Sequence, residues 1–317
     1  MKVFLLAPRE SWIVDRFTIE WYADNYDITV GDPRIADVIW LVADWAWDQL
    51  PYQLLKQKKV LTSVHHIVPD KFGDEELANF VARDEITDAY HVPCEKTAQQ
   101  VRDILSKIGS NKTIHVRPFW VNESLWRPTA KHDARVSLGL DQDLFYVGSF
   151  QRDTEGKDLV SPKLEKGPDQ FCDIVIKLHS ESKDVAVLLG GWRRQYVVNR
   201  LSAAGVPYVY KELPNFETIR KMYAALDMYV VAARYEGGPQ SIVECAAMDV
   251  PIVSTDVGLA AEILDSRCIY NASDFSTFLS AKMHARSDEC RNYAQAKVSE
   301  HFRRPAYTYF RALLQGL

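Results

Sequence analysis

Two acidic residues, Glu236 and Glu244, stand eight positions apart around a turn rich in glycine and proline. The surrounding segment, Arg234 to Glu262, reads RYEGGPQSIVECAAMDVPIVSTDVGLAAE, which predicts a strand end, a turn, a helix, a second strand and a second glycine turn. We expect Glu236 in the turn and Glu244 about one turn into the helix, facing the same side. Carboxylates placed in this way can accept hydrogen bonds from the hydroxyl groups of a ligand.

The turn between the two carboxylates suits an anion. Gly237 and Gly238 have no side chain, so the backbone can approach a ligand closely. The helix is expected to begin near Pro239 or Gln240, and its first turn includes Ser241. The N–H groups of a first turn have no partner within the helix, and the helix dipole is positive there. A diphosphate is therefore an expected ligand.

Short apolar runs alternate along the chain with longer stretches of helical periodicity, which is typical of parallel sheets with helices on both faces. A first series of predicted strands comprises Lys2–Ala7, Asp37–Val42, Lys59–Val64, Ala89–Val92 and Thr113–Val116. A second series comprises Leu144–Ser149, Val185–Leu189, Pro207–Lys211, Met228–Ala232, Ile252–Ser254 and Cys268–Tyr270. The predicted helices are Trp47–Lys56, Glu95–Ser106, Pro168–Ser180, Ile219–Leu226 and Gln240–Met248.

The two series predict two doubly wound α/β domains. The irregular stretch Pro118–Pro128 reads as the linker between them. We expect an N-terminal domain over residues 1–128 and a C-terminal domain over 140–302. The tail is helical except at Pro305, and its amphipathic end, about 303–317, predicts a helix that returns to the first domain. In such folds ligands bind at the carboxyl ends of the strands, here in a central cleft between the two sheets.

Composition narrows the classes of partner. The chain has 317 residues and a net charge of -5, which argues against a nucleic-acid backbone as its main partner. Its five cysteines form no CxxC pair, so neither a disulfide framework nor a zinc site is indicated. The apolar run Val3–Ala7 is too short for a secretory signal or a membrane span. We expect a cytoplasmic protein, with contact to the inner face of the membrane left open.

The motif around Glu236 resembles the retaining glycosyltransferases of family four, also called glycosyl transferases group 1, whose signature places EG and P just after the first of two glutamates eight positions apart. Other segments agree in the same order. Phe145–Phe150, FYVGSF, resembles the strand that opens the second domain of that family. Leu164–Phe171, LEKGPDQF, resembles its K-G-x-x-x-L/F segment, which aligns Lys166 with a phosphate-binding lysine.

The resemblance implies a GT-B fold, with two Rossmann-like domains facing a central cleft, and a retaining transfer of sugar from a nucleoside-diphosphate sugar to a hydroxyl acceptor. It implies polysaccharide biosynthesis, with a glycan, lipid-linked or small-molecule acceptor and no cofactor or metal. The catalytic residues would be Glu236, Lys166 and His65. The donor-binding residues would be Glu244, Arg152, Gly148, Ser149, Gly237, Gly238, Pro239, Gln240, Ser241 and Lys211.

Several positions depart from the family pattern. Ser149 stands where the family usually has arginine, and Arg152 is the nearest substitute. An additional polar loop follows Phe150 and brings Lys157 and Lys163. This loop reads either as a solvated connection or as a lid over phosphate, and we expect Lys163→Ala to be nearly silent.

The sequence also allows two other functions. A sugar-nucleotide epimerase on the same scaffold would turn over its substrate without an acceptor, and a catalytically silent subunit would bind the nucleotide without transfer. The neutral His65 Nε2 is expected either to bond a sugar hydroxyl or to be a structural group. Trp40, Trp45 and Trp47 form either a wall that stacks on sugar or part of the core.

Overall fold

The structure is a computed structural model that describes residues 1–8, 13–156, 158–301 and 305–317, and it divides into two compact units. Unit 1 comprises residues 1–120 and 301–317, and unit 2 comprises residues 121–300. The division falls inside the stretch that the sequence predicts as a linker. Large aromatic side chains on either side of the division, Trp120 in unit 1 and Trp126 in unit 2, are 0% and 2% exposed. They fix each end of the linker to its own unit.

Unit 1 contains a parallel sheet in the order β1-β2-β3-β4-β5. Its strands are β1 (Val3–Leu6), β2 (Val38–Leu41), β3 (Lys59–Ser63), β4 (Ala89–Val92) and β5 (Thr113–Val116). Thr29 forms a parallel bridge to Val3, so pairing also extends beyond β1 on the side away from β2. The helices are α1 (Ile13–Asp24), η1 (Pro33–Ile35), η2 (Asp44–Gln49), α2 (Tyr52–Leu55), η3 (Pro69–Lys71), α3 (Asp74–Asp84), α4 (Glu95–Ile108) and α13 (Pro305–Gln315).

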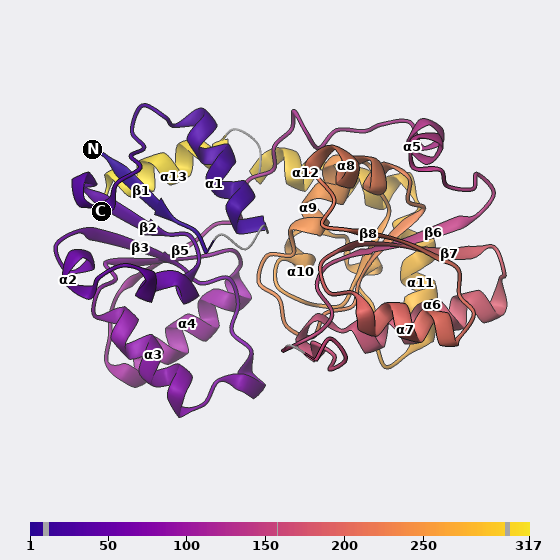
Figure 1. Ribbon diagram of the computed structural model, residues 1–317, viewed down its shortest axis with the longest axis horizontal. Helices are drawn as coiled ribbons and strands as arrows, with labels where there is room; N and C mark the ends of the chain where they lie inside the picture. Colours follow the sequence, from indigo (N-terminus) through magenta and orange to yellow (C-terminus); the bar gives the residue numbers. More distant parts are fainter. Residues whose placement is uncertain (9–12, 157, 302–304) are drawn as a thin grey trace. The chain divides into compact units, whose positions relative to one another are not determined.

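The alternation of side chains along β1 separates two layers of core. Val3 and Leu5 pack with residues of α1 and α13, whereas Phe4 and Leu6 pack on the opposite face. Figure 1 shows α1 and α13 on one side of the sheet and α3 and α4 on the other. Unit 1 is therefore a doubly wound α/β unit.

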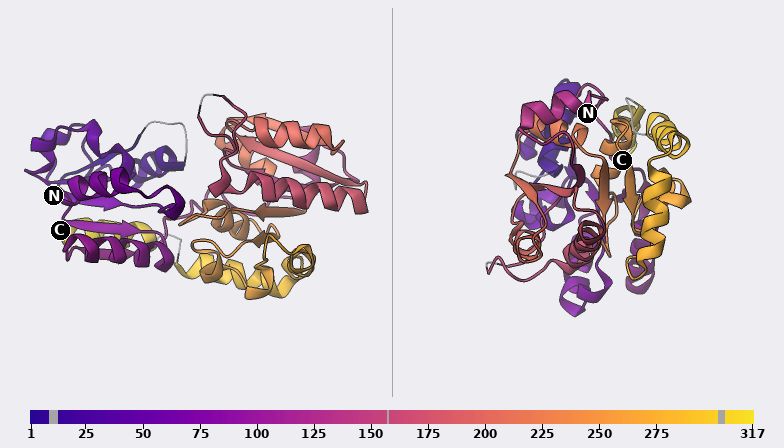
Figure 2. Two further views of the ribbon diagram at one scale, coloured as in Figure 1. Left: turned by 90° about the horizontal axis from the view of Figure 1, so that it is seen from below. Right: turned by 90° about the vertical axis from the view of Figure 1, so that its right-hand side faces the viewer.

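Helix α13 supplies core side chains to unit 1 although it is the last helix of the chain. Ala306, Phe310 and Leu314 recur every four residues, which places them on one face of the helix, and all three are buried. The Phe310 ring stacks on Trp40 with their centroids 4.9 Å apart. Both termini consequently lie in unit 1 (Figure 2).

Unit 2 contains a parallel sheet in the order β10-β9-β6-β7-β8. Its strands are β6 (Phe145–Phe150), β7 (Val185–Gly191), β8 (Tyr208–Glu212), β9 (Met228–Val231) and β10 (Ile252–Ser254). The helices are α5 (Lys131–Leu138), η4 (Leu164–Lys166), α6 (Pro168–Glu181), α7 (Gln195–Ala203), α8 (Phe216–Ala224), α9 (Gln240–Ala247), α10 (Ala260–Ile263), η5 (Ser266–Cys268), α11 (Phe275–Ala285) and α12 (Asp288–His301). Figure 1 shows α6 and α7 on one side of this sheet and α8 on the other.

Two predicted elements are wrong. Cys268–Tyr270 is not a strand, because Asp265 caps a short 3-10 turn, η5, and only one bridge, Ile269 to Ser254, joins it to the sheet. The helix predicted at Trp47–Lys56 is divided in two at Pro51, since proline lacks an N–H and disfavours helical geometry in the preceding residue. The predicted division of the tail helix at Pro305 agrees with the separate helices α12 and α13.

The predicted class of fold is confirmed, because each unit is a parallel α/β sheet flanked by helices. Among the helices of the described residues, none has the length and apolar character needed to cross a bilayer.

Candidate functional site

The strand order of unit 2 locates a candidate site. The chain runs from β6 through β7 to β8 on one side and then crosses back to β9 and β10 on the other. The loops that follow β6 and β9 therefore leave the sheet in opposite directions. In open parallel sheets, ligands bind at such a reversal, outside the carboxyl ends of the strands. Lys166 follows β6 and Glu236 follows β9.

Lys166 and Glu236 form an ion pair at this reversal. The Lys166 Nζ donates to Glu236 Oε1 over 2.5 Å, and each side chain is 17% exposed. Backbone contacts fix the two loops together, because the N–H groups of Arg234 and Tyr235 both donate to Glu165 O, at 2.8 and 3.1 Å. Two residues that lie 70 positions apart in the sequence are thus held in contact by the main chain that carries them.

Two glycines let these loops pack closely. A Cβ on Gly167, whose φ is +64°, would lie 1.6 Å from Ala232 O at the end of β9. A Cβ on Gly258 would lie 1.9 Å from Gly237 O, which also accepts a hydrogen bond from Leu259 N over 2.8 Å. The glycine at 237 is thus packed against the turn that follows β10.

Arg234, for which the sequence offers no role, ties the same loops together. Its guanidinium donates to both carboxylate oxygens of Asp169, at 2.8 and 2.6 Å, and to Leu164 O at 2.9 Å. Burial raises the pKa of Asp169, but hydrogen bonding and charge from Arg234 outweigh it, so the net shift of that pKa is downward. The clamp joins the loop after β9 to the first turn of α6.

Asp249 is also unexplained by the sequence. Its φ is +61°, a conformation that favours glycine, and its carboxylate accepts a hydrogen bond from Arg291 Nε over 2.9 Å.

The additional loop after β6 is anchored rather than merely solvated. Lys163 N donates to Asp153 O over 2.8 Å, Thr154 bridges to Pro162, and Glu155 N donates to Ser161 O over 2.9 Å. These contacts form a hairpin, which we call the β6 hairpin, residues 151–156 and 158–163. Lys157 lies outside the described residues.

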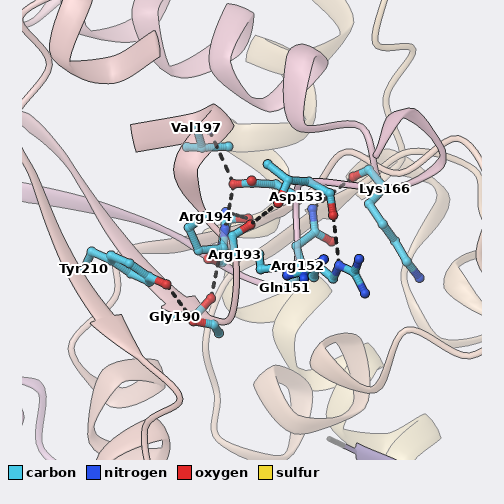
Figure 3. A network of polar contacts seen from close by, with 12 residues as sticks. Gln151, Arg152, Asp153, Lys166, Gly190, Arg193, Arg194, Val197 and Tyr210 are labelled. Atoms are coloured by element: carbon cyan, nitrogen blue, oxygen red, sulfur yellow. Dashed lines mark hydrogen bonds and ion pairs between the residues drawn. The ribbon is translucent and has the colours of Figure 1, made fainter. Parts of the chain in front are cut away.

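A buried ion pair fixes the base of the β6 hairpin (Figure 3). Arg194 Nε donates to Asp153 Oδ2 over 2.9 Å, and both side chains are fully buried. The same guanidinium donates to Gly190 O over 2.8 Å and to Ser149 O. Burial raises the pKa of Asp153, which the positive charge of Arg194 opposes. The pair joins the hairpin to the ends of β6 and β7.

The structure places Gly148 and Ser149 inside β6 rather than in a ligand-facing loop. A Cβ on Gly148 would lie 2.3 Å from Leu226 Cδ1, so packing explains the glycine. Ser149 is 1% exposed, and its Oγ accepts from Arg194 Nη2 over 3.2 Å. That Gly148 and Ser149 bind the donor stays a prediction.

Helix α9 begins at Gln240 with Pro239 at its N-cap, as the sequence predicts. Glu244 is 3% exposed and lies against the Tyr223 hydroxyl, whose pKa is raised by burial and by the charge of Glu244. Ser241 lies beside the Tyr229 hydroxyl. Glu236 and Glu244 therefore differ in environment, one partly exposed in the turn and the other buried on the helix.

Arg152, Gly238 and Lys211 are also predicted to bind the donor. Arg152 is partly buried in the β6 hairpin, where its Nε donates to Thr154 O over 2.8 Å. Figure 3 shows its charged end and that of Lys166 extending to the same side, away from Val197. Gly238 lies in the turn before α9, partly exposed. Lys211 is exposed on β8, the edge strand of the sheet.

His65 belongs to unit 1. Its Nε2 contacts Val42 O over 2.8 Å, so the atom proposed to bond a sugar hydroxyl already bonds the backbone. Its ring stacks on Phe119 with centroids 5.2 Å apart. Of the three tryptophans, Trp40 is fully buried in the core, and Trp47 donates to Asn79 Oδ1 over 2.8 Å. Trp45 is 46% exposed and lies beside the His65 ring, which keeps it as a candidate for stacking.

Sequence reasoning missed Asp153, Arg194 and Tyr223. Charged residues are usually exposed, so nothing in the types of Asp153 and Arg194 points to a buried pair. The one available signal was position, because Arg194 follows the predicted strand Val185–Leu189 and Asp153 follows Leu144–Ser149.

Comparison with known proteins gives matches to glycosyltransferases. Residues 158–284 match the family described as glycosyl transferases group 1, a segment that includes both Lys166 and Glu236. A lipopolysaccharide core biosynthesis mannosyltransferase of Rhizobium meliloti is 29% identical over 144 residues. That match covers 43% of this chain and 38% of the relative.

Solved structures resemble the chain over nearly its whole length. Alr3699/HepE of Anabaena, solved in complex with UDP and glucose, has a TM-score of 0.77 at 14% identity and covers 99% of both chains. The sucrose-phosphate synthase of Thermosynechococcus elongatus has a TM-score of 0.67 at 16% identity, covering 98% of this chain and 81% of its own. The chain thus has the GT-B fold, and its residues 158–284 match the glycosyl transferases group 1 family that its motifs resemble.

Proposed function

We propose that this protein is a glycosyltransferase that takes a sugar from a nucleoside-diphosphate sugar bound at the carboxyl ends of β6 and β9. The observation that carries the proposal is the contact between Lys166 and Glu236, 2.5 Å long, at the reversal of strand order and within the segment that matches the family. A cation for phosphate and a carboxylate for sugar hydroxyls stand side by side there.

The chemistry of transfer fits these groups. Breaking the bond between the anomeric carbon and the diphosphate oxygen builds negative charge on the diphosphate and positive charge on the sugar ring. Lys166 and Arg152, with the N–H groups at the start of α9, would stabilise the departing diphosphate. Glu236 would hold the sugar in position. We propose that these groups suffice without a metal ion, so transfer should persist in EDTA.

We further propose that transfer retains the anomeric configuration, with the acceptor oxygen approaching on the face that the diphosphate leaves. The departing phosphate oxygen would then take the proton of the acceptor hydroxyl. The mannosyltransferase of lipopolysaccharide core biosynthesis supports a glycan or lipid-linked acceptor, and the UDP complexes of Alr3699/HepE support a nucleoside-diphosphate donor. The anomeric coupling constant of the product, measured by NMR, tests retention directly.

The experiment that tests the function has two steps. UDP, GDP, dTDP and ADP sugars are first screened by thermal shift, where a donor present at 100 times its dissociation constant should add about 2.7 kcal/mol of stability. The donor that binds is then incubated with and without candidate acceptors. Transfer that depends on acceptor supports the proposal. Conversion of the donor sugar without an acceptor would indicate an epimerase, and binding without turnover a silent subunit.

A further inference from the structure

The β6 hairpin brings a lysine next to Lys166. Lys163 is the N-cap residue of η4 and Lys166 is its last residue, with Lys166 N donating to Lys163 O over 2.9 Å. The two lysines thus lie at the two ends of one short hydrogen-bonded turn. The side chains are 27% and 17% exposed, respectively.

Arg152 joins these two lysines from the other strand of the hairpin. It precedes Asp153, whose carbonyl accepts the Lys163 N–H over 2.8 Å. The pKa of Lys163 is lowered, first by burial and then by the charge of Lys166, with a further contribution from Arg152. Lys163 is therefore close enough to both Lys166 and Arg152 to be affected by their charges, and the buried Asp153–Arg194 pair fixes the base of the hairpin that carries it.

Each of the two lysines lies beside a carboxylate. Glu165 Oε1 lies 3.4 Å from Lys163 Nζ, and Glu236 Oε1 lies 2.5 Å from Lys166 Nζ. Arg152, Lys163 and Lys166 thus bring three cationic side chains, partly withdrawn from water, to one part of the unit. A diphosphate can accept charge-assisted hydrogen bonds from several such groups at once.

Position 149 offers no such cation. Ser149 is 1% exposed and its hydroxyl accepts from Arg194, which is itself fully buried and engaged with Asp153 and the backbone. Arg152 and Lys163 of the hairpin, by contrast, are partly exposed.

We infer that Lys163, together with Arg152, binds the diphosphate of the donor beside Lys166, and that the β6 hairpin is thus part of the donor site. The inference rests on the proposed function. It also reverses the expectation from sequence that Lys163→Ala is nearly silent, because the structure gives Lys163 a partly buried place beside Lys166.

The test compares binding of a nucleoside diphosphate with binding of its nucleoside. The nucleotide that binds the wild-type chain most tightly among UDP, GDP, dTDP and ADP is titrated by calorimetry, and the matching nucleoside is titrated in parallel. Lys163→Met keeps the apolar stem and removes the charge, Lys163→Arg restores a charge, and Lys183→Met is a control at an exposed lysine after α6. Thermal unfolding confirms that each variant is folded.

We expect Lys163→Met to weaken diphosphate binding by about tenfold or more, the loss of one charge-assisted hydrogen bond, and to leave nucleoside binding unchanged. Lys163→Arg should recover most of the affinity, and Lys183→Met should match the wild type. Diphosphate affinity within twofold of the wild type in Lys163→Met would overturn the inference while leaving the proposed function intact. A wild-type chain that binds none of the four diphosphates would overturn both.

Discussion

At the scale of single residues, the pairing of Lys166 with Glu236 brings a cation and a carboxylate together in the proposed site. Each side chain holds the other in place through a contact of 2.5 Å, and both are partly exposed. A phosphate can therefore draw the ammonium, and sugar hydroxyls the carboxylate, without opening the core.

Lys166→Ala should lower transfer efficiency by about 10- to 100-fold or more, because it removes a charge-assisted bond worth about 1.5–3 kcal/mol in the transition state. The free energy of unfolding should also fall, by about 1–3 kcal/mol, because the largely buried Glu236 carboxylate loses this partner. Initial rates at saturating and subsaturating donor measure the first effect, and urea unfolding measures the second. Full efficiency in Lys166→Ala, with loss of efficiency in Arg152→Ala, would show that the hairpin and not Lys166 contacts the phosphate.

Glu236 and Glu244 should respond differently to mutation. Glu236→Gln keeps the shape of a side chain in the turn and should impair transfer more than nucleotide binding. Glu244→Ala removes a buried carboxylate beside the Tyr223 hydroxyl and should weaken nucleotide binding, with an added loss of stability of about 1–3 kcal/mol. Calorimetry with the free nucleoside diphosphate distinguishes the two roles. Equal losses of nucleotide affinity in Glu236→Gln and Glu244→Ala would contradict this assignment.

At the scale of elements, the packing of η4 against the end of β9 depends on a glycine. Gly167→Ala would place a Cβ 1.6 Å from Ala232 O and should cost well over 1 kcal/mol of stability while displacing Lys166. Gly139→Ala is the matched control, because Gly139 has a similar φ of +68° but no neighbour within 4 Å of its Cβ position. That control should cost only about 1 kcal/mol.

Chemical denaturation and transfer assays on both variants measure this difference. Equal stability of Gly167→Ala and Gly139→Ala would show that the loops relax easily and that the close approach does not fix the site.

Sequence periodicity predicts elements well where the pattern is local. β4, β5 and β10 have the predicted bounds, because each is a short apolar run with clear breaks on both sides. Helix α1 was not predicted, although Val14, Phe17 and Trp21 recur at three and four residues and would have indicated it. The fold class was therefore predictable from pattern, apart from such omissions.

The site was predictable only in part. Lys166 and Glu236 belong to motifs of recognisable spacing, so sequence could single them out. The Asp153–Arg194 pair and the Arg234–Asp169 clamp join residues 41 and 65 positions apart, and their contacts depend on strand register and loop path. Neither is visible in a local pattern. The burial of Glu244 likewise depends on the packing of Tyr223, which lies on a different helix.

At the scale of the whole molecule, each unit has its own core and its own response to acid. In unit 1, Trp40 Nε1 donates to Ser63 Oγ, which donates to His91 Nδ1, and His91 Nε2 donates to Arg117 O, at 2.8, 2.8 and 2.6 Å. The chain of hydrogen bonds requires a neutral imidazole. Burial, with smaller effects of His65 and His115, lowers the pKa of His91 to about 3.

Unit 1 should therefore lose stability as the pH falls. The His91 pKa in the folded chain is below its ordinary value of 6.5, so under that pH the unfolded chain binds a proton that the folded chain does not. The contribution is fully present above pH 6.5 and is lost progressively toward pH 3, with a slope approaching about 1.4 kcal/mol per pH unit. Urea unfolding at several pH values, followed by tryptophan fluorescence, measures this slope.

His91→Gln should have a shallower slope than the wild type in this range, whatever its stability at neutral pH. His132→Gln, at an exposed position on α5, is the control and should keep the wild-type slope. An unchanged slope in His91→Gln would contradict the role of the buried imidazole.

The central claim, that a nucleoside diphosphate binds where the loops after β6 and β9 meet in unit 2, is tested most directly by hydrogen exchange with and without a saturating nucleoside diphosphate. The account predicts slower exchange in the peptides that carry Lys166 and Glu236, and in those that begin α9. Saturated binding with unchanged exchange in these peptides, and protection confined to other segments, would contradict it.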